Sequence, residues 1–466
     1  MKYTIREELF DDKVCHHMDV GLLQRVIPPQ LVEQVLSDCG AWEERERKLN
    51  MVAMVYLLIV QALEPELARE DVFAQLVAGL RLLGVDLPPP LAGKSALAQR
   101  LLQLGEESLQ QLFARCARPL ATMQTTPQAF WKGLRLMALD GTLDSVPDTE
   151  STRQSFRYSS DHPVSRSPFP LLRMLLLVEC GTHLICDAAF SSCREGEVRT
   201  AESLIKRSLQ ADMLVLWDSG LHKSVLFFLV RQLQGQVLGR LKDGILTAEV
   251  ERLPDGSYLT YVYEDQDHHQ GEHLLVRVIS YTFTDERIPS VGQTHRLVTT
   301  LLDHEQYPAL ELAALYHERW HVEEVIDELK THLRLSARTL RALTPAGIRQ
   351  EVYGVLLAHI AVRRLMLEAA ALARLAPTQL SFSKAVRLWE QTQPYSLLVA
   401  PQARARWEED VLHELAQARL PVQRLRLQAR VVKRVRSKYE RKQPLHLKAP
   451  PFEPGVDFQH LMALVT

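Results

Sequence analysis

The chain has 466 residues, of which 46% are hydrophobic and 24% are charged. This length suits roughly three domains of ~150 residues, and the apolar content can fill several cores, which excludes a disordered chain. The 55 Lys and Arg residues against 57 Asp and Glu leave a formal net charge of -2. Bulk charge therefore gives no support to nucleic-acid binding, and only a local cluster of charge can do so.

The apolar runs argue against a membrane protein, and the cysteine spacing argues against a structural zinc site. The longest apolar run, residues 51–63, falls short of the roughly 20 residues that span a bilayer, and it predicts a buried helix. The opening MKYTIREELF lacks a secretory signal, so we expect no membrane association and a cytoplasmic location. The six cysteines show no C-x-x-C spacing, which predicts reduced thiols, and Cys15-His16-His17 lacks the distant partners of a metal site.

The first part of the chain has a helical pattern. From Pro28 to about Thr122, apolar residues recur at three- and four-residue spacing, and Gly40 and Gly84 stand where helices would end. Pro88-Pro89-Pro90 divides this region in two. The pattern alone favours a plain helical bundle, with a DNA-binding module as the alternative.

An α/β pattern follows, because short apolar runs replace the helical spacing. The predicted order is β-β-β-α-β-α, over residues 134–139, 171–178, 183–189, 197–209, 213–217 and 222–233. A second strand-rich block then alternates like a half-exposed antiparallel sheet, and a long helical pattern resumes at Tyr307. We therefore expect five segments: a helical N-terminal domain (1–125), an α/β core (126–233), a β-strand insertion (234–305), the rest of the core (306–372) and a helical, basic C-terminal region (373–466).

Two aspartates follow predicted strands. Asp140 comes in ALDGT, where Gly141 is expected to turn the backbone, and Asp218 follows the strand in LVLWDSG. Because catalytic groups of open α/β sheets gather at strand ends, this pair can share a metal ion. The plain alternative, a turn former or helix cap, is the more common role of such an aspartate.

The helix predicted from about Leu312 carries four polar side chains on one face. Tyr316, Arg319, Glu323 and Lys330 fall within an arc of about 60° at ~100° per residue. A hydroxyl, two cations and an acid beside a buried stripe suit phosphate binding next to a metal carboxylate. An ordinary solvated ion pair between Arg319 and Glu323 remains the alternative.

These residues carry a specific resemblance. The segment from Tyr316 to Lys330 is similar to the Y-x2-R-x3-E-x6-K signature of DDE transposases of the insertion-sequence-four family, and Asp140 and Asp218 match that family's two catalytic aspartates. The resemblance covers roughly residues 25–445. It implies a ribonuclease-H-like core, a mixed sheet flanked by helices, with an antiparallel β insertion.

The resemblance also implies the chemistry. Asp140, Asp218 and Glu323 would hold two Mg²⁺ ions, with Mn²⁺ as a substitute, for cleavage at transposon ends and strand transfer into target DNA. Tyr316 and the two cations of the signature, Arg319 and Lys330, would bind DNA phosphates. Expected partners are double-stranded DNA, as terminal inverted repeats and target, and a second copy of the chain in a paired-end complex of a bacterial, nucleoid-associated protein.

The sequence departs from the family at two places. Relatives that form a DNA hairpin stack a flipped base on a tryptophan of the β insertion, but residues 234–302 contain no Trp. Tyr281 and Phe283 are weak substitutes, so the hairpin step stays open. Ser219 stands where relatives often carry Arg, which removes one expected phosphate contact.

Two basic regions are candidate DNA contacts. Residues 424–442 hold nine basic residues against one acid, and Arg153, Arg157 and Arg166 lie in the segment 151–168, which is expected to be a loop. Solvated surface charge is the alternative for both.

Three other functions remain as alternatives. They are a metal-dependent nuclease of the same core without strand transfer, a catalytically silent DNA-binding protein, and a glycosidase with paired carboxylates, for which no specific feature speaks. Joining of a precut end to a target plasmid would separate a transposase from a nuclease.

Overall fold

The computed structural model describes residues 20–42, 50–82, 93–162, 166–242, 244–245, 247–265, 270–288, 290–333, 340–421 and 457–465. The chain forms two compact units, each assembled from separated segments. Unit 1 comprises Met1–Phe130, Gly141–Gly196 and His321–Arg419, and unit 2 comprises Trp131–Asp140, Glu197–Trp320 and Leu420–Thr466. This division is by compactness, and the five segments expected from the sequence remain a prediction.

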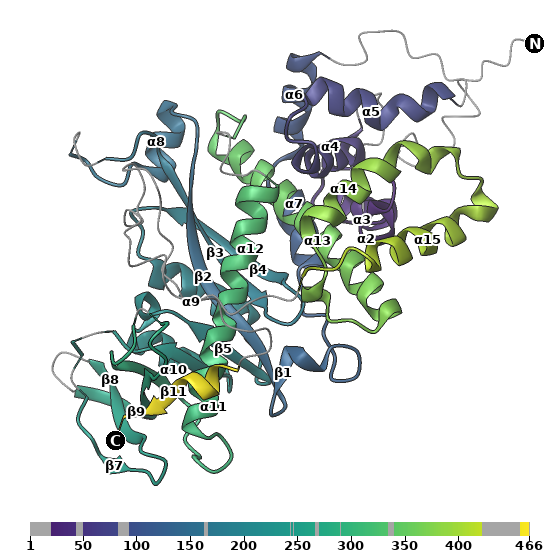
Figure 1. Cartoon of the computed structure of the whole chain (residues 1–466). Helices are drawn as coiled ribbons and strands as arrows, with labels where there is room; N and C mark the ends of the chain where they lie inside the picture. Colours follow the sequence, from purple (N-terminus) through teal and green to yellow (C-terminus); the bar gives the residue numbers. More distant parts are fainter. Residues whose placement is uncertain are drawn as a thin grey trace, which may run out of the picture. The chain divides into compact units, whose positions relative to one another are not determined.

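Unit 1 is mainly helical around the long α13 (Pro345–Ala373), which begins at the cap Thr344 and ends at Arg374 in the left-handed conformation. The apolar run expected to form a buried helix is α4 (Met51–Leu63), capped by Asn50 and packed against α13 (Figure 1). Its other helices are α2 (Leu23–Val26), α3 (Pro29–Asp38), α5 (Arg69–Leu82), α6 (Lys94–Leu104), α7 (Glu107–Cys116), α8 (Glu150–Phe156), α14 (Phe382–Thr392) and α15 (Arg404–Ala416), with short 3-10 turns between them.

Unit 1 also contains an antiparallel pair of strands, β3 (Leu171–Glu179) and β4 (Leu184–Ser192). One expectation for this unit is wrong: the segment 151–168 is not all loop, because its first residues belong to α8. A reciprocal capping box between Thr149 and Thr152 starts that helix, a signal that short polar residues conceal.

Unit 2 contains a mixed sheet in the order β2-β5-β6-β10-β9-β8-β7. β2 pairs with β5 and β5 with β6 in parallel, whereas β10, β9, β8 and β7 join antiparallel. Its strands are β2 (Leu134–Ser145, of which the part to Asp140 lies in this unit), β5 (Met213–Trp217), β6 (Gln236–Arg240), β7 (Glu251–Arg252), β8 (Tyr258–Asp265), β9 (Gln270–Phe283) and β10 (His295–Thr299). The α/β class with a mixed sheet is therefore confirmed.

The strands expected to form an insertion continue this sheet, since β6 pairs in parallel with β5. The helices α9 (Glu197–Ser208) and α10 (Ser224–Gln232) also belong to unit 2. β11 (Met462–Leu464) pairs with β9 at residues far earlier in the chain, which no sequence pattern indicated (yellow in Figure 1). None of the helices in the described part of the chain has the length and hydrophobicity that a membrane span requires.

Candidate active site

Asp140 and Asp218 come next to the same paired residues of two adjacent strands of unit 2. Leu139 of β2 pairs with Trp217, the last residue of β5, and each aspartate is the next residue of the chain. Neighbouring strands lie about 4.8 Å apart and residues in register share a face, so the two carboxylates leave the same side of the sheet. This register brings the two aspartates to the same place in the sheet, as the sequence predicts.

The backbone at Asp140 differs from the expectation. β2 does not end there but continues to Ser145, so Gly141 makes no turn. What ends at this point is the pairing with β5, whose last paired residue is Trp217. Asp140 is thus exposed to one side where its neighbour strand stops. Its carboxylate accepts a hydrogen bond of 2.9 Å from Arg319, and both side chains are about one fifth exposed (23% and 17%).

Asp218 caps a short 3-10 turn, η3 (Ser219–Leu221), by accepting a 2.8 Å hydrogen bond from the N–H of Gly220. The residue before it is held as well, because the Tyr316 hydroxyl donates to the Trp217 carbonyl at 3.2 Å. Burial, joined by the negative charge of Asp218, raises the pKa of Tyr316 to about 12. Tyr316 is therefore a neutral donor at physiological pH, and it supports the backbone that leads to Asp218.

The Trp217 indole packs directly against the backbone of a glycine on the next strand. A Cβ on Gly239 of β6 would lie 2.2 Å from the indole Nε1 of Trp217, which is fully buried. We expect Gly239→Ala to lower the free energy of unfolding by about 1–3 kcal/mol, the usual range for overpacking a core. Gly196→Ala is the control, since nothing lies within 4 Å of its added Cβ. Denaturant unfolding checks this, and equal stability of the two variants would contradict it.

The helix of the signature is not one uniform α-helix. It runs as α11 (Ala309–Leu315), the 3-10 turn η4 (Tyr316–Arg319), α12 (Trp320–Asp327) and the π-helical η5 (Glu328–His332). A 3-10 turn winds more tightly and a π turn more loosely than an α-helix, so the value of ~100° per residue is an idealisation here and the common face of the four residues stays a prediction. Of the signature residues, Tyr316 and Arg319 lie in unit 2, and Glu323 and Lys330 lie in unit 1.

In unit 1, Glu323 is a partly buried residue of α12. The Lys330 ammonium donates to the Leu143 carbonyl at 2.9 Å and lies 3.6 Å from the buried carboxylate of Asp144. No sequence pattern indicated Asp144, because a buried acid that pairs with a lysine does not differ in pattern from other strand residues.

The other acids of this helical run have partners of their own in unit 1. Glu324 lies 3.4 Å from both His183 and His321, and Glu328 is buried against Arg363. Asp327 is exposed and accepts a 2.8 Å hydrogen bond from Thr331.

The other candidate residues have structural partners or lie outside the described residues. Tyr281 and Phe283 are buried (3% and 5% exposed) within an aromatic cluster, so neither offers an open face to a base. Arg153 pairs with Asp148, and Arg166 stacks on a tyrosine. The cluster Cys15-His16-His17 and the basic stretch 424–442 lie outside the described residues.

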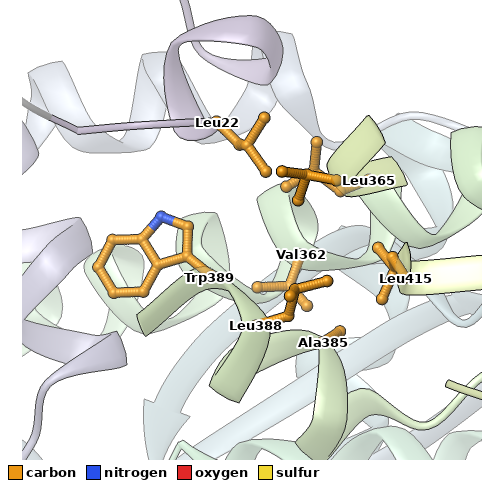
Figure 2. Close-up of a pocket in the computed structure, with 8 residues that line it drawn as sticks. Leu22, Val362, Leu365, Ala385, Leu388, Trp389 and Leu415 are labelled. Carbon is orange, nitrogen blue, oxygen red and sulfur yellow. The ribbon is translucent and has the colours of Figure 1, made fainter. Parts of the chain in front are cut away.

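A small cavity in unit 1 carries no site. Figure 2 shows the Trp389 indole on one side of this cavity and aliphatic side chains beside it. The cavity volume is about 10 Å³, room for no more than one water molecule. All eight described residues that line it are apolar: Leu22, Val362, Leu365, Ala385, Leu388, Trp389, Val411 and Leu415.

The chemistry therefore centres on carboxylates. Their oxygens are the ligands that hard divalent cations prefer, and Asp140 and Asp218 are only partly buried, so a hydrated ion can reach both. This donor set fits a divalent metal.

Comparison with known proteins gives the same chemistry. A family described as Transposase DDE domain matches residues 131–361, which contain Asp140, Asp218 and Glu323, and Insertion element 4 transposase N-terminal matches residues 17–114. The chain is 29% identical over 369 residues to Transposase InsG for insertion sequence element IS4 of Escherichia coli (strain K12), covering 77% of this chain and 79% of the relative. A solved piggyBac transposase synaptic complex with hairpin DNA aligns at a TM-score of 0.42 and 11% identity, covering 84% of each chain.

The family matches and the Escherichia coli relative define the class of the protein as a DNA transposase, an enzyme that cleaves DNA and transfers strands with the help of divalent metal ions. The chain belongs to the insertion-sequence-four family of DDE transposases. Its mixed α/β architecture agrees with the ribonuclease-H-like core that this family implies. Neither a nuclease without strand transfer nor a silent DNA-binding protein is favoured.

Proposed function

We propose that Asp140, Asp218 and Glu323 together hold two Mg²⁺ ions, for which Mn²⁺ can substitute, and form the catalytic centre of this transposase. The observation that carries the proposal is the pairing of Leu139 with Trp217 on neighbouring strands, which Asp140 and Asp218 directly follow. Arg319, which bonds Asp140, precedes Glu323 by four residues, about one turn of helix. Bound metal ions would activate the attacking oxygen and stabilise the leaving oxygen of an in-line displacement.

The residues of the chain have separate tasks in this proposal. Arg319 orients the Asp140 carboxylate through its 2.9 Å hydrogen bond, and Tyr316 holds the Trp217 carbonyl and so the backbone before Asp218. Arg319 and Lys330, with side chains 17% and 26% exposed, also offer positive charge to DNA phosphates. Arg319 and Lys330 are accordingly the proposed phosphate-binding residues. Tyr316, the third residue expected to bind phosphate, is buried with its hydroxyl on the Trp217 carbonyl, and we propose that it supports the site through the backbone before Asp218.

The proposed reaction is cut and paste. Hydrolysis at the terminal inverted repeats frees a 3′-hydroxyl, which attacks a phosphodiester of the target DNA and displaces a 3′-oxygen there. Two ends must be paired before they are joined, so we propose a homodimer on two transposon ends. The terminal repeats can be found by sequencing the DNA that flanks the gene.

The test is a joining assay. The purified chain, a precut DNA end carrying those repeats and a supercoiled target plasmid should give joined products with Mg²⁺ or Mn²⁺, and none with EDTA. Light scattering of the complex with DNA ends should give two chains per complex. Cleavage without joining would favour a nuclease, and joining that persists in EDTA would exclude the metal site.

A further inference from the structure

A buried polar network in unit 1 has no part in the proposed function. It joins four segments of the unit: the turn between β3 and β4, α12, η5 and α13. Its members are His183, His321, Glu324, Glu328, His359 and Arg363.

The centre of the network is the ion pair of Glu328 and Arg363, which are 7% and 2% exposed. The guanidinium Nε donates to the Glu328 carboxylate at 3.0 Å, and His359 Nε2 lies 2.8 Å from the same oxygen. Burial raises the pKa of Glu328, but the Arg363 charge and the histidine hydrogen bonds outweigh it, so this pKa lies well below its ordinary value. Glu328 is therefore a charged anchor at the start of the π turn.

His183 connects the Glu328–Arg363 ion pair to α12, because it contacts both Arg363 and His321. It is 3% exposed, it adopts a φ of +59° that non-glycine residues rarely adopt, and its Nδ1 lies 2.7 Å from the Arg363 guanidinium. A guanidinium only donates, so His183 Nδ1 must accept, and the ring proton is on Nε2. That Nε2 lies 2.6 Å from Nδ1 of His321 and donates to it.

The same atoms have the spacing of a metal site. Ligand atoms of His183, His321 and Glu324 lie within 4.8 Å of one another. A metal ligand needs an unprotonated ring nitrogen, whereas the contact with Arg363 leaves the proton on His183 Nε2, which faces His321. The directions of the hydrogen bonds therefore favour a structural hydrogen-bonded chain from Arg363 through His183 to His321 over a bound metal ion.

The buried polar network contacts one face of the helix that carries Glu323. His321, Glu324 and Glu328 are spaced by three and four residues, and Glu323 lies about 100° around the helix from Glu324. We propose that Glu328, Arg363 and His183 are positioning residues, which fix the rotation of α12 and so aim the Glu323 carboxylate at its metal ion. This inference rests on the proposed role of Glu323 as a metal ligand.

The test measures metal binding rather than activity. Binding of Mn²⁺ to the full chain, followed by electron paramagnetic resonance, should weaken by about tenfold or more in Glu328→Gln, as when a group that orients metal ligands is lost. The control is Glu351→Gln, which breaks another buried ion pair on α13, with Arg69. The control should bind Mn²⁺ as the unchanged chain does, and all variants should keep their affinity for DNA ends.

A second pair of variants covers the case in which Glu328→Gln does not fold. His183→Ala should weaken Mn²⁺ binding, and His183→Gln, which keeps a donor toward His321, should restore part of it. Nitrogen-15 spectra of labelled histidines should show His183 protonated on Nε2. Protonation on Nδ1, or stoichiometric zinc that His183→Ala loses, would overturn the inference.

Glu323→Gln separates this inference from the proposed function. If Glu323→Gln leaves Mn²⁺ binding unchanged, the role of Glu323 itself is wrong. If it weakens binding while Glu328→Gln behaves like Glu351→Gln, only the positioning role is wrong.

Discussion

Alanine at Asp140, Asp218 or Glu323 is expected to abolish metal-dependent end cleavage, with a loss of at least about 10³-fold, while DNA binding stays largely intact. The physical reason is that each carboxylate supplies oxygen ligands and negative charge that no neighbour replaces. Asp140 and Asp218 directly follow the paired residues Leu139 and Trp217 of adjacent strands, so removal of either leaves a single acid there. Cleavage of a labelled transposon end in Mg²⁺, with a gel-shift measurement of binding, checks the result.

Two acids serve as matched controls for the triad. Asp212→Ala removes a half-exposed carboxylate of unit 2 that pairs with Arg135 at 3.5 Å, and Asp327→Ala removes the exposed neighbour of Glu323 on α12. Both variants should cleave normally. Retained cleavage in any triad variant, or its loss in Asp327→Ala, would show that the acids are wrongly assigned.

Arg319→Ala is expected to slow cleavage by about 10- to 150-fold, because a hydrogen bond to a charged group contributes roughly 1.5–3 kcal/mol. Arg319 donates to Asp140 at 2.9 Å, so the variant frees this carboxylate to move and also removes a proposed phosphate contact. Arg319→Lys keeps the charge but not the planar donor geometry, and we expect it to recover only part of the rate. Single-turnover rates at saturating DNA measure both.

The control for Arg319 is Arg135→Ala on β2. Arg135 belongs to the same unit and makes a 3.5 Å ion pair with the half-exposed Asp212, a type of pair that contributes little. Equal cleavage rates for Arg319→Ala and Arg135→Ala would show that Arg319 has no role in the proposed catalytic centre.

Much of the fold can be predicted from local pattern. Periodicity correctly predicts the strands before the two aspartates, the buried helix at residues 51–63 and the alternation of strands and helices. The reason is that burial of one face of an element requires apolar residues at the repeat of that element. The predicted bounds fail where local chemistry is subtle. β2 continues past Asp140, and α8 starts from a capping box that looks like loop composition.

The signature residues show where sequence reasoning stops. Their order and chemical type are visible in the chain, but a single helical period does not describe a run that changes from 3-10 to α to π geometry. Such changes arise when a helix adjusts its hydrogen bonds to its neighbours. The expected common face therefore stays a prediction. The tertiary structure adds that the acidic neighbours Glu324 and Glu328 have partners of their own in His183 and Arg363.

The kind of protein can be recognised from residue types and their order: two acids after strands, a third in a helix with a tyrosine and two cations, and the elements between them. Which atoms come into contact depends on tertiary packing. The contact of Arg319 with Asp140 joins residues 179 apart, and that of Arg363 with His183 joins residues 180 apart. Local periodicity reports burial and backbone geometry, but contacts at such separation depend on how whole elements pack, which no short window of sequence contains.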